Sequence, residues 1–198
     1  MRILYEIRGI RKISLYLQNI MFNSYYKKIL SSNVKIFGFP IISIKNPSQL
    51  KIGKNLILIS NSYFSEAAIN HPVILRALND SARIEIGNNV GISGGGICAA
   101  KEIEIGHDVL IGANAFVTDT DFHTINPDKR RYTKDDVKAE KVIIKENVFI
   151  GMNSIILKGV TIGKNTIIGA GSIVTKNISE NVIAAGNPCR VLRELEKK

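Results

Sequence analysis

The chain has 198 residues, of which 45% are hydrophobic, and a formal net charge of +10 at pH 7. This composition fits one domain with a core and excludes a disordered chain. No apolar run approaches the roughly eighteen residues of a membrane span, and the N-terminus lacks the apolar stretch of a secretory signal, so we expect a cytoplasmic protein. Its two cysteines, Cys98 and Cys189, form neither a disulfide framework nor a metal site. The positive charge suits nucleic acid, an acidic membrane surface or a polyphosphorylated small molecule.

Residues 1–33 are predicted to be helical, because apolar side chains recur there at spacings of three and four with basic residues between them. One interpretation is a helix that packs on and caps the first coil of the structure that follows. The alternative is a basic amphipathic surface, in residues 1–28, that lies on anionic lipid at the inner face of the membrane. The sequence does not decide between them.

An apolar residue recurs about every six positions from residue 34 onward, with a break at residues 65–81. The recurrence predicts the coils of a solenoid, whose first turns are commonly irregular. His71 lies in the break and His107 in a turn, so we interpret them as a loop residue and a solvated corner. The expected inward residues here are Ile36, Ile42, Ile52, Leu58, Phe64, Ile86, Ile92, Cys98, Ile105, Ile111 and Val117.

A long polar loop, residues 124–141, interrupts the repeat directly after His123. Insertions into a solenoid form surface loops that often line a binding site. Because an imidazole titrates near neutral pH, His123 is the candidate general base. Asp119 and Asp121 beside it either orient the imidazole or the acceptor, or cap backbone N–H groups.

Residues 142–177 carry the most regular pattern. They divide into VIIKEN, VFIGMN, SIILKG, VTIGKN, TIIGAG and SIVTKN, each with a branched apolar residue third and Asn or Gly sixth. Asn and Gly tolerate positive φ, so each group predicts a short strand and a corner. This period indicates a parallel β-helix, and not a helix or a sandwich of ordinary strands. The inward positions are Ile144, Ile150, Ile156, Ile162, Ile168 and Val174, and the corners are Asn147, Asn153, Gly159, Asn165, Gly171 and Asn177.

The tail after Ile178 supplies a Gly-Asn-Pro turn and then a predicted short basic helix, with Val191 and Leu192 available to pack. The expected organisation is therefore a single all-β domain, 1–198. It comprises the helical segment 1–33, the β-helix 34–180 with its loop 124–141, and the C-terminal tail and helix 181–198.

The run IGANAFVTDTDFHTI, the loop, and the run from VFIGMN to VLREL resemble the hexapeptide-repeat acyltransferases. Within that family they are most similar to the maltose and galactoside O-acetyltransferases and to related enzymes that acetylate capsular and lipopolysaccharide sugars. The resemblance covers about residues 84–195. It implies a left-handed β-helix, acetyl-CoA as co-substrate, and a homotrimer with active sites between neighbouring prisms. It also implies that His123 is the catalytic base.

The resemblance implies further contacts, residue by residue. Met152 matches a position whose backbone N–H meets the thioester carbonyl. Ser93 stands where the family usually has an acceptor-contacting Asn, and Phe149 stands where an aromatic residue is often Trp. With Asp121, these are the expected acceptor contacts. The other expected coenzyme contacts are Ala170, Thr175 and Lys176 along the pantetheine and adenine, and Arg190 and Arg193 near the 3′-phosphate.

The expected function is acetyl transfer from acetyl-CoA to a sugar hydroxyl in surface polysaccharide biosynthesis. His123 would deprotonate the hydroxyl as it attacks the thioester, and a backbone donor would stabilise the oxyanion. No metal and no nucleic acid are expected. The alternatives are an N-acetyltransferase of an amino-sugar nucleotide, which often has an N-terminal α/β domain, and an acetyltransferase of a xenobiotic. A zinc carbonic anhydrase requires convergent imidazoles that these spacings do not give, and a non-catalytic solenoid does not need the polar loop.

Overall fold

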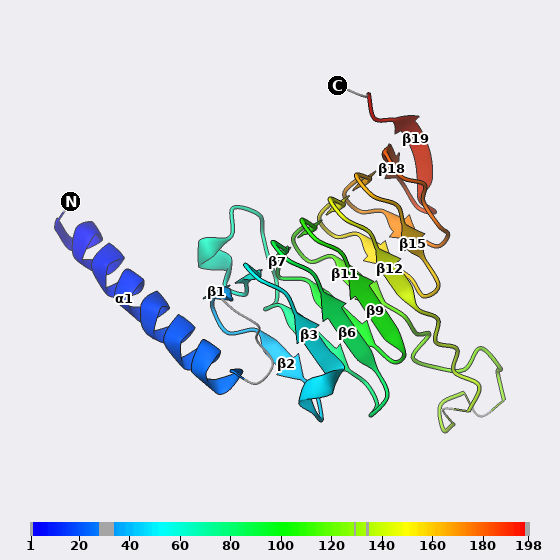
Figure 1. The fold of residues 1–198 in the computed structure, drawn as a ribbon, viewed down its shortest axis with the longest axis horizontal. Coiled ribbons are helices and arrows are strands. Elements are labelled where there is room, and N and C mark those ends of the chain that lie inside the picture. Colours follow the sequence, from blue (N-terminus) through cyan, green and yellow to red (C-terminus); the bar gives the residue numbers. More distant parts are fainter. Residues whose placement is uncertain (1, 28–33, 129, 134, 197–198) are drawn as a thin grey trace.

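The computed structural model describes residues 2–27, 34–128, 130–133 and 135–196, with only the backbone described for 2–12. Short strands wind around one axis and form three flat faces (Figure 1). Each coil passes from face B to face C and then to face A, and each strand pairs in parallel with strands of the neighbouring coils. The fold is the parallel β-helix that the six-residue period predicts.

The faces are built from strands of two to four residues. Face A contains β3 (Leu50–Ile52), β6 (Arg83–Ile86), β9 (Glu102–Ile105), β12 (Val142–Ile144) and β15 (Thr161–Ile162). Face B contains β1 (Lys35–Phe37), β4 (Ile57–Ile59), β7 (Gly91–Ser93), β10 (Leu110–Ile111), β13 (Phe149–Ile150), β16 (Ile167–Ile168) and β18 (Val182–Ala185). Face C contains β2 (Ile41–Ser43), β5 (Ile74–Ala77), β8 (Gly96–Ala99), β11 (Phe116–Thr118), β14 (Ile155–Ile156) and β17 (Ile173–Val174).

The core is a set of aliphatic ladders that run along the axis. On face B the strand register stacks Ile36, Leu58, Ile92, Ile111, Ile150 and Ile168. All six inward positions predicted in residues 142–177 are buried. Where coils approach most closely only glycine fits, since a Cβ at Gly151 would lie 2.5 Å from the backbone nitrogen of Ala170. The period of six therefore predicted the core of the regular part correctly.

Some details of the repeat differ from the prediction. Ile97, and not Cys98, occupies the core ladder of face C between Leu75 and Val117. The spacing of inward residues is five here instead of six, from Ile92 to Ile97, because only Gly94 and Gly95 separate β7 from β8. Ile42 and Phe64 are only partly buried, the latter in the short turn η2 (Ser62–Phe64).

The predicted corner at Asn177 is also wrong. Its five counterparts have positive φ, but after β17 the positive φ falls at Asn181. The side chain of Asn177 instead accepts a hydrogen bond from the N–H of Thr161 at 2.8 Å. Because the chain leaves the regular rhythm here, the left-handed residue moves to the entry of β18.

The helix α1 (Arg2–Tyr25) caps the first coil, as one of the two interpretations expected. The amide of Asn19 pairs with the backbone of Ile36, donating to its oxygen at 2.9 Å and accepting from its N–H at 2.8 Å. Asn23 donates to the oxygen of Val34 at 3.0 Å, and Phe22 is buried. These amides satisfy backbone groups at the free edge of β1. The predicted helix extended to residue 33, and residues 28–33 lie outside the described part.

The predicted C-terminal helix is wrong, because residues 190–194 form a strand. This strand, β19 (Arg190–Glu194), pairs antiparallel with β18. Without β19, the outer edge of β18, the last parallel strand of face B, would be open, and pairing satisfies its backbone groups where a helix would not. Within the described residues, no helix combines the length and the apolar character needed to cross a membrane.

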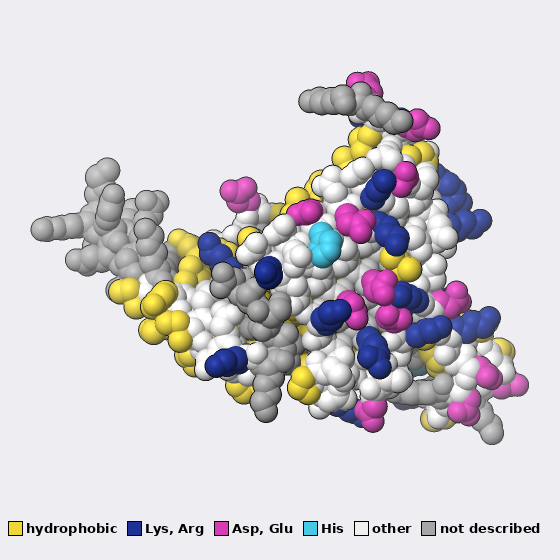
Figure 2. Space-filling model, viewed as in Figure 1, with side chains coloured by type: hydrophobic (Ala, Val, Ile, Leu, Met, Phe, Trp, Pro, Cys, Tyr) yellow, Lys and Arg dark blue, Asp and Glu magenta, His cyan; other side chains and the backbone are white. Residues whose placement is uncertain are grey.

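The outer surfaces of the faces differ. Charged side chains of both signs cover face A, the face toward the viewer (Figure 2). Lys141 pairs there with Glu104 at 2.5 Å and Glu102 at 3.2 Å. The hydrogen bond from Lys141 holds the pKa of Glu104 below its usual value. The other two faces carry apolar outward columns: Ile57, Leu110, Phe149, Ile167 and Ile183 on face B, and Ile41, Ile74, Phe116, Ile155 and Ile173 on face C.

Candidate active site

His123 lies five residues beyond β11, at the start of the long loop. Its backbone N–H donates to the oxygen of Asp121 at 2.7 Å, and its side chain is exposed. Phe122, just before it, has φ of 61°, which is rare for an aromatic residue. The ring of Phe122 stacks on Phe116 with the centroids 6.4 Å apart. A tight turn thus presents the imidazole to solvent, at a strain of about 1 kcal/mol or more.

Asp119 fixes the beginning of this turn. Its side chain is fully buried, and its carboxylate accepts hydrogen bonds from three backbone N–H groups, those of Ala100 at 2.6 Å, Lys101 at 2.7 Å and Glu102 at 2.6 Å. These donors belong to the corner of the preceding coil. Of the two roles expected for Asp119, the structure therefore shows backbone capping, and its oxygens face away from solvent.

The two arms of the loop pair with each other where they leave the prism. Glu140 N–H donates to the oxygen of Asp119 at 2.8 Å, and Asp121 N–H donates to the oxygen of Lys138 at 3.2 Å. The carboxylate of Asp121 also forms an ion pair with Lys158 at 2.8 Å, on the next coil. The base of the loop, and with it the position of His123, is therefore held to the β-helix by both backbone and side-chain contacts.

The remaining candidate residues fall at two different corners. Ser93, Met152 and Ala170 lie where the chain turns from face B to face C, which we name the B/C corner. Thr175 and Lys176 follow β17 at the turn from face C to face A, the C/A corner, and the loop with His123 and Asp121 leaves from that same corner. All of them except Ser93 and Asp121, which are partly buried, are exposed. One chain therefore places His123 and Met152 on opposite edges of face C.

Three expected contacts lie outside both corners. Phe149 projects outward from face B and is 44% exposed. Arg190 and Arg193 are exposed on β19, where their guanidinium groups donate only to backbone oxygens, those of Cys189 and Glu194. No ion pair with a carboxylate engages either arginine within the described residues, so both cations can meet an anionic ligand.

A second loop, residues 60–73, overlaps the break in phase that the sequence placed at residues 65–81. The break ends earlier than expected, because β5 begins at Ile74 and Leu75 joins the core ladder of face C. The loop covers the B/C corner between β4 and β5 and lines an open hollow of about 270 Å³. Asn114 ties it to the fourth coil, accepting from the N–H of Asn70 at 2.9 Å and donating to the oxygen of Ala68 at 2.8 Å. Polar residues dominate the lining, which comprises Ser60, Asn61, Ser62, Ile69, Asn70, His71 and Pro72. The abundance of Ser and Asn in this segment was the available signal.

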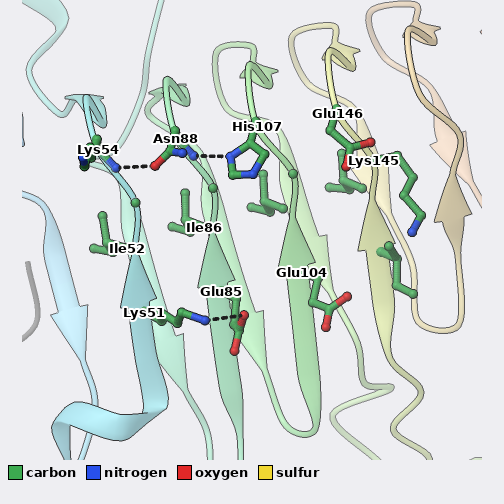
Figure 3. A pocket seen from close by; sticks show the side chains of 16 residues that line it. Lys51, Ile52, Lys54, Glu85, Ile86, Asn88, Glu104, His107, Lys145 and Glu146 are labelled. Atoms are coloured by element: carbon green, nitrogen blue, oxygen red, sulfur yellow. Dashed lines mark hydrogen bonds and ion pairs between the residues drawn. The ribbon is translucent and has the colours of Figure 1, made fainter. Parts of the chain in front are cut away.

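Face A carries a larger, open groove of about 620 Å³ along its edge (Figure 3). The N–H of Asn88 donates to Nδ1 of His107 at 2.8 Å, and the N–H of Lys54 donates to Oδ1 of Asn88 at 2.8 Å. His107 is thus an exposed corner residue that stabilises the stack, in line with its interpretation from the sequence. The groove contains none of the residues of the two corners.

Replacing Asp119 with Ala is expected to lower the free energy of unfolding by about 2–4 kcal/mol, because three backbone donors lose a charged acceptor. Urea unfolding followed by circular dichroism would measure the loss. The matched control is Asp128→Ala, which removes an exposed carboxylate of the loop and should change stability by less than about 0.5 kcal/mol. A loss below about 1 kcal/mol for Asp119→Ala would contradict the capping role.

Residues 141–176 match the family model described as bacterial transferase hexapeptide (six repeats). Residues 141–176 of this chain therefore carry hexapeptide repeats. The chain is 47% identical over 94 residues to the galactoside O-acetyltransferase of Lactococcus lactis. The match includes 48% of this chain and 44% of that enzyme, so the chain spans less than half the length of the relative.

Two solved structures are similar to this chain over most of its length. A maltose O-acetyltransferase from Clostridium difficile 630 has a TM-score of 0.55 at 25% identity and covers 100% of this chain and 90% of its own. AntD, an N-acyltransferase from Bacillus cereus in complex with dTDP and 3-hydroxybutyryl-CoA, has a TM-score of 0.65 at 25% identity and covers 83% and 81%. These similarities confirm the left-handed β-helix and the family resemblance expected from the sequence.

Proposed function

We propose that this protein transfers an acetyl group from acetyl-CoA to a sugar hydroxyl, in the biosynthesis of a surface polysaccharide. The observation that carries the proposal is the exposed imidazole of His123, presented by a turn that Asp119 pins to the prism. The similarity of this region to galactoside and maltose O-acetyltransferases supports a sugar hydroxyl as the acceptor.

In the proposed reaction His123 takes the proton of the acceptor hydroxyl while the oxygen attacks the thioester carbonyl. The same imidazole then returns the proton to the departing thiolate, so it acts first as base and then as acid. Met152 lies at the B/C corner, and its N–H is the proposed donor for the developing oxyanion. Asp121, Ser93 and Phe149 remain the proposed acceptor contacts.

The residues of the C-terminal part fit the charged end of acetyl-CoA. Lys176, Arg190 and Arg193 are exposed, and none of them pairs with a carboxylate in the described part of the chain. Exposed guanidinium groups are well suited to bidentate phosphate contacts. Ala170 and Thr175 would line the path of the pantetheine arm between these cations and Met152.

The active unit proposed is a homotrimer. Since one chain separates His123 from Met152 by the width of face C, a complete site needs the C/A corner of one chain and the B/C corner of its neighbour. The apolar outward columns of faces B and C offer surfaces for such contacts, whereas charged face A suits solvent.

N-acylation of an amino-sugar nucleotide is the second candidate, favoured by the structural similarity to AntD. This chain covers 81% of that N-acyltransferase. An N-terminal α/β domain is therefore a weaker criterion for N-acylation than the sequence suggested.

The test is release of coenzyme A thiol from acetyl-CoA in the presence of hydroxyl-bearing and amino-bearing sugars, with products identified by mass spectrometry. An ester product labile to hydroxylamine supports O-acetylation, and a stable amide supports the second candidate. Thiol release that no sugar accelerates would refute both.

The double variant Arg190→Gln/Arg193→Gln is expected to raise the KM for acetyl-CoA at least about tenfold with little change in kcat, since remote phosphate contacts stabilise ground state and transition state alike. Initial rates at varied acetyl-CoA would measure this. The control is Lys54→Gln/Lys101→Gln, which removes the same charge from exposed positions away from β19. An unchanged KM in the arginine variant would show that β19 does not contribute to the binding of acetyl-CoA.

A further inference from the structure

One face of the helix α1 packs against the β-helix. Asn19 and Asn23 bind the backbone of the first coil, and Phe22 is 3% exposed beneath them. Leu15 and Tyr26, on the same side of the helix, are partly buried. This face accounts for the capping of the open end of the stack.

The opposite face of α1 is apolar and uncovered. Its residues recur at spacings of three and four, which places them on one side of a helix. No described residue of the chain covers them, and Figure 2 shows hydrophobic side chains along the described part of the helix. The exposed fractions are 62% for Ile13, 68% for Tyr16, 52% for Leu17, 49% for Ile20, 64% for Met21 and 81% for Tyr25.

The sequence around this face is strongly basic. Residues 1–28 contain six Lys or Arg and one Glu, so this segment supplies half of the net charge of +10. If two copies of the chain packed through this face, they would bring like charges together. A negatively charged surface would neutralise them, and a lipid bilayer would also accept the apolar side chains.

We propose that α1 lies in the plane of an anionic lipid surface, with Ile13, Leu17 and Met21 inserted between the headgroups. Tyr16 and Tyr25 fit the same position, because tyrosine has an apolar ring and a polar hydroxyl that suit the interface. The helix would thus hold the β-helix on one side and the membrane on the other. The proposal is independent of the transfer reaction, since it invokes no residue of either corner.

Flotation of the intact protein with vesicles would test the proposal without acetyl-CoA or acceptor. Binding to phosphatidylcholine vesicles that contain phosphatidylserine is expected to be at least about tenfold tighter than binding to phosphatidylcholine alone. Leu17→Asp should weaken binding to the anionic vesicles at least about tenfold, because a carboxylate replaces an inserted apolar side chain.

The matched control is Leu78→Asp, which introduces the same charge at a leucine that is 40% exposed on the β-helix. It should bind the vesicles as the parent does. Ile20→Ser is a second variant of the helix face, for use if Leu17→Asp does not fold. Equal binding of the helix variants and the control, or no vesicle binding by the parent, would overturn the proposal. A change of oligomeric state in the helix variants with vesicle binding intact would assign the face to a second copy.

Discussion

Replacing His123 by Ala is expected to reduce the turnover of acetyl transfer by at least about a hundredfold, the usual contribution of a positioned general base. The affinity for coenzyme A and the oligomeric state should stay close to those of the parent, because the imidazole acts in the transition state and its side chain is exposed. Steady-state rates of thiol release, together with calorimetric titration of coenzyme A, would measure both.

His107→Ala is the matched control for this experiment. His107 is also exposed, but it accepts a backbone hydrogen bond on the charged face and lies away from both corners. Its loss should leave turnover within about twofold while lowering stability by roughly 1 kcal/mol. Turnover of His123→Ala within tenfold of the parent would refute its assignment as the base.

Two inactive variants should restore activity when they are co-expressed. His123→Ala removes the base from the C/A corner, and Ala170→Trp places a bulky ring on the expected coenzyme path at the B/C corner, where Ala170 is exposed. If each site combines the two corners from neighbouring chains, about a quarter of the sites in randomly mixed trimers contain two intact corners. The measurement is thiol release by purified mixed oligomers, compared with each variant alone.

Co-expression of His123→Ala with His123→Gln provides the control, since both lesions affect the same corner and no mixture restores a site. Activity of the mixed His123→Ala and Ala170→Trp oligomers no higher than that of the separate variants would show that the site does not combine the two corners. Light scattering on the same samples would report whether the active species is a trimer.

The parts of the fold that follow the six-residue period were predictable, because burial and corner geometry there depend on local sequence. The six inward positions between residues 144 and 174 are buried as expected, and Asn147, Asn153 and Asn165 adopt positive φ. The prediction was wrong where pairing with a distant strand outweighs the local conformational preference of the sequence. Residues 190–194 have a helix-like pattern but form β19, since the open edge of β18 requires a partner.

The candidate site was predictable only in part. His123 was identifiable because the repeat is interrupted there by a long polar loop. The capping of Asp119 depends on the backbone of a coil that lies 17 to 19 residues earlier in the chain, which no local pattern reveals. The separation of His123 and Met152 depends on the order of the faces around the axis, which the period alone does not specify. The hollow under residues 60–73 arises from a loop whose path follows no repeat.

The number of coils between α1 and His123 fixes the distance between them along the axis of the β-helix. The helix α1 lies against the first coil, and His123 follows β11 in the fourth. With a rise of about 4.8 Å per coil, these levels are about 14 Å apart, and a helix diameter of about 10 Å adds to that height. Together these give about 24 Å, so with the outer side of α1 inserted through a headgroup layer of about 6 Å, the imidazole would stand about 18 Å above that layer. A lipid-linked acceptor would then be acetylated on the sugar units farthest from the lipid. The sugars next to the lipid would lie too close to the bilayer to contact His123.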